Sequence, residues 1–144
     1  MLVQQILSSK SGEGIISVKP DSTVADAANI LSSKRIGTVV VSSDGTTLEG
    51  ILSERDIVRE LGKRGAGCLQ ETVDGMMTSK LVTCTKEDTA DGVLEMMTRG
   101  RFRHLPVMED GKMVGLISIG DVVKARLAEL SMEKDALEGM IMGH

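Results

Sequence analysis

The sequence predicts an α+β fold in which two β-α-β-β-α repeats pack about a pseudo-twofold axis. The first observation is a phrase of the form Gly-apolar-apolar-Ser-x-x-Asp at residues 50–56, which returns at residues 115–121, about 65 positions later. The second is a threonine followed by apolar residues at helical spacing, which precedes each phrase at Thr23 and at Thr89. Because one copy is too short to bury a stable core alone, the two copies are expected to pack on each other.

The first repeat is expected to contain a strand, a helix, two hairpin strands and a second helix. Pro20 stops the first strand, and Thr23 caps the first helix with Asp26 in the capping-box position. A Ser-Asp-Gly turn at 43–45 joins the hairpin strands, and Gly62 ends the second helix. The expected ranges are 15–18, 23–34, 37–41, 47–52 and 53–61.

The second repeat is expected to follow the same order after a linker. Residues 63–67 are basic and rich in glycine, which predicts an exposed connection between the repeats. A turn at Asp110 and Gly111 joins the second hairpin, and Pro106 is expected at an edge or where there is no ladder donor to lose. The strand, the helix and the two hairpin strands are expected at 82–84, 89–99, 105–108 and 113–117.

The last helix, opened by Ser118, is expected to be longer than its counterpart in repeat one. Residues 121–137 contain neither Gly nor Pro. Lys134 interrupts an apolar stripe on this helix, and such a stripe needs a partner surface in the module or in another subunit. The stripe consists of Val123, Leu127, Leu130 and Leu137.

The start of the chain lies outside the repeats. Residues 1–10 predict a short helix or strand, and residues 8–14 predict a loop. The predicted organisation has four parts: an N-terminal segment, repeat one, repeat two and a C-terminal helix extension. Their expected ranges are 1–13, 14–66, 67–130 and 131–144.

Composition narrows the class of protein. Of the 144 residues 41% are hydrophobic and 26% are charged, which is typical of globular proteins. The net charge of −4 and the single aromatic residue, Phe102, argue against a DNA-binding surface. No apolar run approaches the roughly 18 residues of a membrane span, and the first residues lack the basic start of a signal peptide. A cytoplasmic location without membrane contact is therefore expected.

Residues that could carry catalysis or bind metal are few. Cys68 and Cys84 are far apart, and only His104 and His144 could join them in a zinc site. Reduced structural thiols and no metal are therefore expected. The sequence also lacks a Gly-rich phosphate loop and a set of nucleophile, base and orienting group. An enzyme is not expected, nor is a catalytic cofactor.

The duplicated order of elements, with its two Gly-apolar-apolar-Ser-x-x-Asp phrases, closely resembles the pair of cystathionine β-synthase (CBS) domains called a Bateman module. The resemblance covers about residues 14–130. It implies a stand-alone regulatory module that binds an adenine nucleotide (AMP, ADP, ATP or NAD/NADH) in clefts between the repeats. S-adenosyl compounds and magnesium-bound ATP also remain open. The resemblance further implies a homodimer that stacks through its helices.

The resemblance places the serine and aspartate of each phrase at the ligand. In CBS pairs this aspartate binds the ribose hydroxyls, and the serine lies near ribose or phosphate, which implies Ser53, Asp56, Ser118 and Asp121. A carboxylate can accept hydrogen bonds from both hydroxyls of a cis-diol, and a helix N-terminus offers free N–H groups to an anion. The same residues also fit simple helix capping boxes, in which the serine oxygen accepts from a helix N–H.

The resemblance also implies phosphate and adenine contacts. Basic residues before a Pro-Val strand approach phosphate, which implies Arg101, Arg103 and His104, although a solvated basic turn is the alternative. Repeat one has Gly37 at the matching place and lacks these charges, so the two clefts are not expected to bind one ligand equally. The remaining implied ligand-binding residues are Ile16, Ser17, Arg35, Thr38, Val39, Val82, Thr83, Leu105, Pro106 and Val107.

Arg55 is a second asymmetry, because its counterpart in repeat two is Gly120. A cation in the first turn opposes the helix dipole, so Arg55 would be better placed facing a phosphate. A solvated face of Arg55, Arg59 and Lys63 at helical spacing is equally open. The alternative function is a dimeric scaffold, or a subunit that regulates an unknown protein without a nucleotide. Nucleotide bound to the purified protein would separate the two functions.

Overall fold

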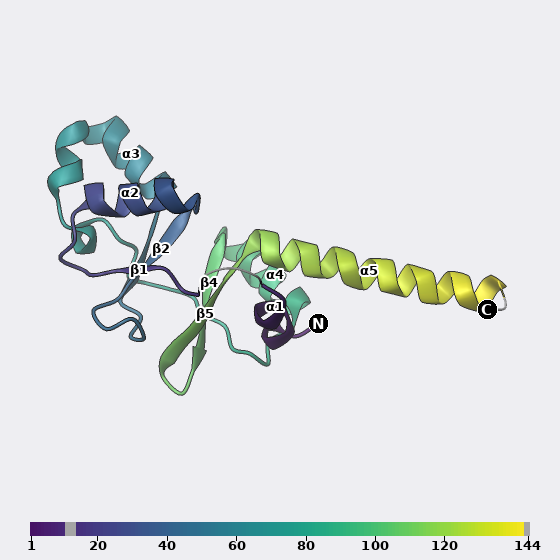
Figure 1. Ribbon diagram of the computed structural model, residues 1–144. Coiled ribbons are helices and arrows are strands. Elements are labelled where there is room, and N and C mark those ends of the chain that lie inside the picture. The colour runs from purple at the N-terminus through teal and green to yellow at the C-terminus, as the bar shows by residue number, and fades with distance from the viewer. Residues whose placement is uncertain (11–13, 143–144) are drawn as a thin grey trace. The chain divides into compact units, whose positions relative to one another are not determined.

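The computed structural model of the chain describes residues 1–10 and 14–142. The chain forms two compact units. The repeat-one unit comprises Glu13–Val82 and Glu109–Val114, and the repeat-two unit comprises Met1–Gly12, Thr83–Met108 and Gly115–His144. Helices and small sheets make up the described residues, which confirms the predicted α+β class (Figure 1).

The repeat-one unit contains a three-stranded sheet in the order β1, β2, β3. Strand β1 is parallel to β2, and β2 is antiparallel to β3 with Val39 opposite Leu52. Both side chains belong to a buried apolar cluster that also contains Leu31 and Ile57 from the helices. The elements are β1 (Ser17–Val18), α2 (Val24–Lys34), β2 (Thr38–Val41), β3 (Gly50–Ser53), α3 (Glu54–Arg64) and the 3-10 helices η1 (Ala66–Gln70) and η2 (Val73–Gly75).

Helix α2 forms where the threonine phrase predicts it. Oγ1 of Thr23 accepts a hydrogen bond from the backbone N–H of Asp26 at 3.1 Å, which caps the helix. Val24, Ala27 and Leu31 recur on one face of the helix and are buried. The apolar spacing therefore buries this face of α2 in the core of the unit.

Strand β3 begins at Gly50, so the predicted start at residue 47 is wrong. The Asp44 carboxylate accepts hydrogen bonds from the backbone N–H groups of Thr46 at 2.9 Å and Thr47 at 2.7 Å. These bonds hold residues 44–47 in a turn, as aspartate side chains often do. The turn therefore takes up the residues that the sequence pattern assigned to the strand.

Helix α3 continues through Gly62, so the predicted end at that glycine is also wrong. Leu61 packs against the apolar cluster, and the Arg64 guanidinium pairs with the Glu60 carboxylate one turn earlier at 2.8 Å. The helix ends at Gly65, whose φ of 78° suits glycine. Residues 63–67, predicted to be a linker, are exposed but belong to α3, to Gly65 and to η1.

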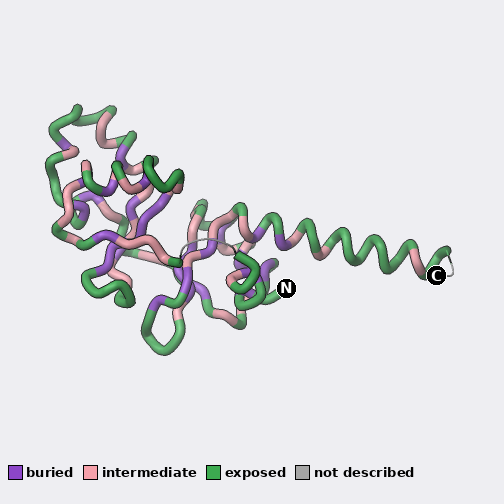
Figure 2. Tube along the Cα trace, viewed as in Figure 1, coloured by how far each residue is buried: buried purple, intermediate pink, exposed green. Residues whose placement is uncertain are grey.

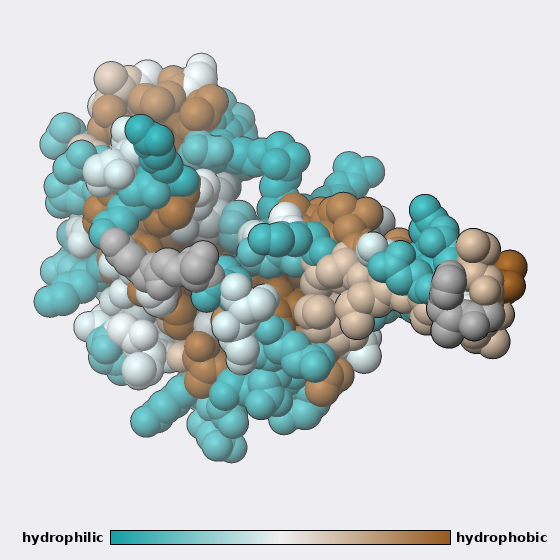
Figure 3. All heavy atoms as spheres, turned by 45° about the vertical axis from the view of Figure 1, so that its right-hand side comes forward, coloured by the Kyte–Doolittle hydropathy of each residue, from teal (hydrophilic) through white to brown (hydrophobic). Residues whose placement is uncertain are grey.

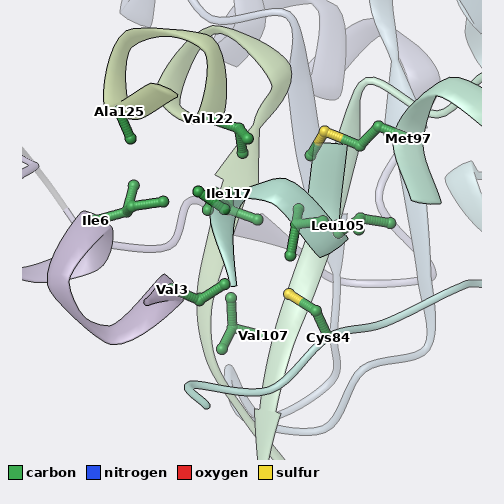
Figure 4. Close-up of a cluster of buried hydrophobic side chains, with 11 residues drawn as sticks. Val3, Ile6, Cys84, Met97, Leu105, Val107, Ile117, Val122 and Ala125 are labelled. Carbon is green, nitrogen blue, oxygen red and sulfur yellow. The ribbon is translucent and has the colours of Figure 1, made fainter. Parts of the chain in front are cut away.

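The repeat-two unit is built on one apolar core. Helix α4 starts after Thr89, whose Oγ1 accepts from the N–H of Gly92 at 3.0 Å. A turn with positive φ at Asp110 and Gly111 lies between β4 and β5, as predicted. Figure 4 shows side chains from α1, α4, α5 and the hairpin converging in this core. The elements are α1 (Val3–Ser9), α4 (Ala90–Gly100), β4 (His104–Glu109), β5 (Lys112–Ser118) and α5 (Ile119–Met142), except that residues 109–114 of the hairpin group with the repeat-one unit.

The first strand of repeat two, predicted at 82–84, is reduced to one parallel bridge between Cys84 and Val107. In repeat one the N–H of Val40 donates to the carbonyl of Ile16 at 3.1 Å. Pro106 takes the place of Val40 in repeat two and has no N–H to donate. One ladder bond of the strand is therefore lost, which explains why the prediction failed.

Within residues 1–10 the chain forms helix α1 (Val3–Ser9), the first of the two alternatives that the sequence left open. Val3 and Ile6 are almost fully buried in the core of the repeat-two unit. Ser8 and Ser9 belong to α1, so the predicted loop starts later than residue 8. Residues 11–13 of that loop lie outside the described residues.

The glycine that opens each repeated phrase lies under a side chain of its own unit. A Cβ on Gly115 would come within 2.8 Å of the Leu7 side chain from α1. A Cβ on Gly50 would overlap the Met77 side chain and lie 3.0 Å from the Thr78 carbonyl. Close packing therefore gives the two glycines the same structural role.

Helix α5 contains 24 residues, more than twice the length of α3 with 11. Its first turns pack through Val122 and Ala125 against α4 and α1. Figures 1 and 2 show that the remainder extends from this contact as an almost entirely exposed helix. Among the described residues, no helix combines the length and apolar character that a bilayer span requires.

Candidate functional site

Ser118 and Asp121 form a reciprocal capping box where β5 passes into α5. The backbone N–H of Ser118 donates to Oδ2 of Asp121 at 2.9 Å, and the N–H of Asp121 donates to Oγ of Ser118 at 3.1 Å. This geometry fixes a carboxylate and a hydroxyl beside the free N–H groups of a helix N-terminus. Such a group of atoms can accept hydroxyl hydrogens and face an anion. We call its surroundings the repeat-two site.

Arg103 and His104 lie at the start of β4, beside this capping box. The backbone N–H of Ile119 donates to the carbonyl of Arg103 at 2.8 Å, which ties the first residue of α5 to the segment before β4. His104 is half-buried. Burial, followed by the positive charges of Lys10 and Arg103, lowers the pKa of His104 although Asp121 opposes the shift. His104 is therefore mostly neutral at pH 7.

Lys10, at the end of α1, reaches the same carboxylate. Its ammonium lies 2.9 Å from Oδ2 of Asp121 and donates to the carbonyl of Leu116 at 2.9 Å. Burial alone would raise the pKa of Asp121, but the hydrogen bonds from Lys10 and Ser118 and the charge of Lys10 outweigh it and lower the pKa. Asp121 is therefore ionised at neutral pH and forms an ion pair with Lys10 of the same chain. Together with Arg103, this pairing leaves the site with an excess of positive charge.

The other residues implied for repeat two differ in their exposure. Arg101 caps α4 in the left-handed conformation with φ of 58° and is exposed. Thr83 is exposed, and Val82, which belongs to the repeat-one unit, is 38% exposed. Leu105, Pro106 and Val107 are buried, so any contact of Leu105 and Val107 with a ligand would come from their backbone.

The corresponding group in repeat one has the same cap but another partner. The N–H of Ser53 donates to Oδ2 of Asp56 at 3.0 Å, and the N–H of Asp56 donates to Oγ of Ser53 at 3.2 Å. Arg59, one turn along α3, pairs with Oδ1 of Asp56 at 2.9 Å. Arg59 is exposed, as the predicted solvated face of Arg55, Arg59 and Lys63 requires. It also forms an ion pair with the Asp56 carboxylate.

A carboxylate without a counterpart in repeat two lies beside the repeat-one cap. The N–H of Glu54 donates to the carbonyl of Gly37 at 2.9 Å, the same bond that joins Ile119 to Arg103 in repeat two. Gly37 therefore takes the place of Arg103. Oε1 of Glu54 lies 3.6 Å from where a Cβ on Gly37 would be. Repeat one thus presents a carboxylate where repeat two presents a guanidinium, an arrangement that disfavours phosphate.

The other residues implied for repeat one have mixed exposure. Arg35 caps α2 in the left-handed conformation with φ of 54°, as Arg101 caps α4, and both are exposed. Arg55 is exposed in the first turn of α3. Ile16 and Ser17 are half-buried, whereas Thr38 and Val39 are buried in β2. The two repeats thus match in backbone but differ in charge.

Comparison with known families agrees with the repeated geometry. The family profile described as CBS domain matches residues 6–63 and 73–128. The chain belongs to the CBS-domain family. Both capping boxes lie inside the matched ranges, as do Lys10, Arg59 and Arg103.

Several CBS relatives are similar along most of this chain. The CBS domain-containing protein CBSX3, mitochondrial, from Arabidopsis thaliana is 37% identical over 127 residues, which cover 85% of this chain and 62% of that protein. The crystal structure of a CBS-domain containing protein from Agrobacterium tumefaciens has a TM-score of 0.82 and 44% identity, covering 88% of this chain and 99% of that one. The crystal structure of CBSX2 in complex with AMP has a TM-score of 0.68 and 29% identity, covering 79% and 88%. The chain thus spans less than two thirds of CBSX3.

Sequence reasoning missed Lys10 and Glu54. Lys10 lies outside the repeated phrases, and its contact with Leu116 joins residues 106 positions apart. Glu54 lies inside the first phrase, at a position that the Ser-x-x-Asp pattern leaves unspecified. The available signal was the pair Glu54 and Ile119, which differ in charge at matching positions of the two CBS repeats.

The cysteines do not add a reactive group to the site. Cys68 and Cys84 are buried, and both are free thiols. Burial, with a smaller effect of the Asp88 carboxylate, raises the pKa of Cys84 to about 12, so its thiol stays protonated. In the described part of the chain, no three His, Cys, Asp or Glu side chains gather in a way that could hold a metal ion.

We expect His104 to make the stability of the CBS fold depend on pH. Because folding lowers the pKa of His104, the unfolded chain binds more protons around its ordinary value of 6.5. The free energy of unfolding should therefore rise with pH, and this contribution should be lost as the pH falls below about 6.5. Urea unfolding between pH 5.5 and about 7.5 should give a smaller slope for His104→Gln than for wild type, with His144→Gln as control. Parallel curves for wild type and His104→Gln would contradict this expectation.

Proposed function

We propose that this CBS-domain chain is a regulatory sensor that binds an adenine nucleotide at the repeat-two site, with AMP as the preferred candidate. The observation that carries the proposal is the group formed by the capped Asp121 carboxylate, Ser118, Arg103 and the neutral His104. The carboxylate suits a ribose cis-diol, and the guanidinium beside a helix N-terminus suits a phosphate. The AMP complex of the similar protein CBSX2 supports AMP as the first ligand to test.

We propose unequal binding by the two CBS repeats. Repeat one keeps the Ser53 and Asp56 cap, but Arg59 already pairs with its carboxylate. Glu54 adds negative charge next to Gly37, where repeat two has Arg103. Phosphate repulsion should therefore make the repeat-one site the weaker of the two for AMP, ADP, ATP and NAD/NADH.

The decisive test identifies what the purified protein carries. The chain has neither Trp nor Tyr, so its own near-ultraviolet absorbance is very low. The protein would be denatured and filtered, and the filtrate examined by absorbance and mass spectrometry. We expect an adenine spectrum with the mass of AMP. If the filtrate is empty, titration calorimetry with AMP, ATP, NAD and NADH follows, and no binding by any of them would overturn the proposal.

A second candidate function is a protein scaffold without a nucleotide. Both Ser-x-x-Asp phrases form complete capping boxes, which gives these residues a structural role without any ligand. The scaffold function would use α5 as its docking surface. It predicts an empty filtrate, no stabilisation by nucleotides and an Asp121 variant that loses stability alone.

We further propose that the chain is a homodimer joined through α5. Six positions of this helix at alternating intervals of four and three residues, the spacing of a coiled-coil seam, carry exposed apolar side chains except for one lysine. Figure 3 shows apolar atoms, in brown, beside hydrophilic ones at the far end of the helix. The positions of the seam are Val123, Leu127, Leu130, Lys134, Leu137 and Ile141.

The regulatory role requires a protein that responds to the ligand. A nucleotide can shift the module between arrangements only if it binds them with different affinity. We propose that this shift regulates an unknown partner protein and does not serve catalysis by this chain. The cytoplasmic location stays a prediction, and one relative is named as mitochondrial.

A further inference from the structure

Helix α1 holds the backbone of Lys10 at a fixed place in the repeat-two unit. Val3 and Ile6 anchor the helix in the core with at most 2% of either residue exposed. The N–H of Val3 also donates to the carbonyl of Asp88 at 2.8 Å. Lys10 is the C-cap of this helix. Its long side chain therefore starts from a fixed point, and its ammonium can move while the helix stays in place.

The ammonium of Lys10 lies on the atoms that the ligand is proposed to use. It is 2.9 Å from Oδ2 of Asp121, the oxygen that also accepts from the N–H of Ser118. It further donates to the carbonyl of Leu116 at 2.9 Å. The side chain of Lys10 is 39% exposed and that of Asp121 is 23% exposed. A ribose that binds this carboxylate therefore has to compete with a cation of the chain itself.

We propose that Lys10 determines ligand specificity at the repeat-two site by holding Asp121 until a ligand displaces its ammonium, so that the site selects adenine ligands that carry a phosphate. This inference rests on the proposed function, because it concerns the same site. The ribose hydroxyls take the place of the ammonium on the carboxylate. The displaced ammonium then pairs with the phosphate of the same ligand.

Charge explains why the selection favours phosphorylated ligands. Moving Lys10 away from Asp121 breaks an ion pair, and a neutral ligand such as adenosine offers no anion in return. AMP supplies a phosphate with which the ammonium can form charge-assisted hydrogen bonds. Arg103 and the half-buried His104 lie near this position, and the charge of Lys10 already acts on His104. Lys10 therefore disfavours adenosine and favours AMP.

Among the described residues, the repeat-one cap has a different cation partner. The partner of Asp56 is Arg59, which lies one turn away on the same helix. That ion pair is local and adds to the stability of α3 itself. Lys10 instead comes from a separate helix and belongs to no repeated phrase. The ion pair between the capping-box aspartate and a cation of a separate helix therefore distinguishes the repeat-two site from the repeat-one site.

The test compares Lys10→Met with wild type by titration calorimetry, using AMP and adenosine as the two probes. Methionine keeps much of the apolar stem and removes the charge. We expect the Kd for adenosine to fall about two- to fivefold, because an exposed ion pair no longer competes. We expect the Kd for AMP to rise about three- to tenfold, because a phosphate partner is lost. The preference for AMP over adenosine should thus shrink by about tenfold.

Two further variants make this result specific. Lys112→Met removes one charge at the exposed start of β5 and should leave the preference unchanged. Lys10→Arg keeps the charge and should retain most of the preference for AMP. A thermal unfolding curve for each variant shows that the protein under titration is folded.

The outcomes separate this inference from the proposed function. If wild type binds AMP but Lys10→Met leaves the ratio of the two Kd values unchanged, Lys10 is a structural ion pair and the inference is overturned alone. An equal change for both ligands also overturns it, because selection by phosphate requires opposite changes. If wild type binds no adenine ligand, the proposed function fails and the inference fails with it.

A measurement without ligand tests the starting position of the ammonium. The charge of Lys10 lowers the pKa of His104. An NMR titration of the imidazole should therefore give a higher pKa in Lys10→Met than in wild type or Lys112→Met. An unchanged pKa would show that the ammonium is not held at the site, and would overturn the proposed competition.

Discussion

Replacing Asp121 with alanine is expected to weaken the binding of AMP by about tenfold or more. The substitution removes the acceptor proposed for the ribose hydroxyls, and a hydrogen bond to a charged group contributes about 1.5–3 kcal/mol. Each 1.4 kcal/mol corresponds to about one factor of ten in Kd. The freed ammonium of Lys10 can still pair with the phosphate, so AMP should still bind more tightly than adenosine. Titration calorimetry with both ligands measures the two losses.

The matched control for this variant is Asp56→Ala in repeat one. Both substitutions remove the acid of a complete capping box, so both should lower the free energy of unfolding by about 1 kcal/mol. Only Asp121 lies beside Arg103, whereas Asp56 lies beside Arg59 and near Glu54. We therefore expect Asp56→Ala to change the Kd for AMP less than about threefold. Equal losses from the two variants would contradict the proposed inequality of the sites.

A third variant separates the cap from the ligand contact. Asp121→Asn keeps an oxygen that can accept from the N–H of Ser118, so the reciprocal bond of the capping box can still form. It loses the negative charge that pairs with Lys10. If Asp121→Asn restores stability but not affinity, the carboxylate contributes to binding. If Asp121→Ala loses stability while the folded fraction binds AMP as wild type does, the capping interpretation is sufficient.

The helix starts were predictable because their signals are local. Thr23 and Thr89 are N-caps, and apolar residues at helical spacing after them are buried. The Ser-x-x-Asp phrases form the capping boxes that their spacing allows. In each case the interacting residues lie within one turn of each other. Local spacing therefore determines the geometry directly.

Strand ends were less predictable because they depend on hydrogen bonds with other segments. The strand expected at 82–84 is reduced to one bridge because Pro106 lacks the N–H that Val40 supplies in repeat one. Pro106 was visible in the sequence, but the residue facing it was not known before the register was seen. The start of β3 was missed for a different reason: the local Asp44 turn takes up residues 44–47 through bonds that β propensity does not represent.

In the candidate site, too, the contacts within one repeat were predictable and the contact with a distant segment was not. Ser118, Asp121, Arg103 and His104 come together because β4, β5 and the start of α5 are consecutive elements of one repeat. Lys10 reaches the site through the packing of α1 in the core, and no repeated pattern indicates that contact. A motif thus identified the acceptor of the site, and only the tertiary structure identified the cation that occupies it.

We expect Leu130→Asp to convert the proposed homodimer into a monomer at micromolar concentration. Leu130 is 49% exposed in the single chain and lies on the α5 seam. Burial of a leucine side chain contributes about 1.5–3 kcal/mol, and a symmetric dimer counts the change twice. A carboxylate in an apolar seam adds a desolvation cost. Sedimentation or light scattering should thus show a dissociation constant at least about a hundredfold larger.

The control is Ala128→Asp, which adds the same charge to an exposed position of the same helix, off the seam. This variant should remain dimeric. Far-ultraviolet circular dichroism shows how much helix each variant retains. An isolated helical segment of about 15 residues is marginal in water, so the exposed end of α5 should also lose some helix when the partner leaves. A wild-type protein that is monomeric at micromolar concentration would contradict the proposal at once.

Lys134 gives the same seam a test of opposite sign. It interrupts the apolar stripe, and its ammonium lies 3.8 Å from Glu138 on the same helix. A lysine at one core position of a coiled coil lowers stability while it restricts register. Lys134→Leu should therefore tighten the dimer, whereas Leu130→Asp should weaken it. If α5 instead docks an unrelated protein, Leu130→Asp should impair that partner's binding, and neither variant should change the mass of the purified chain.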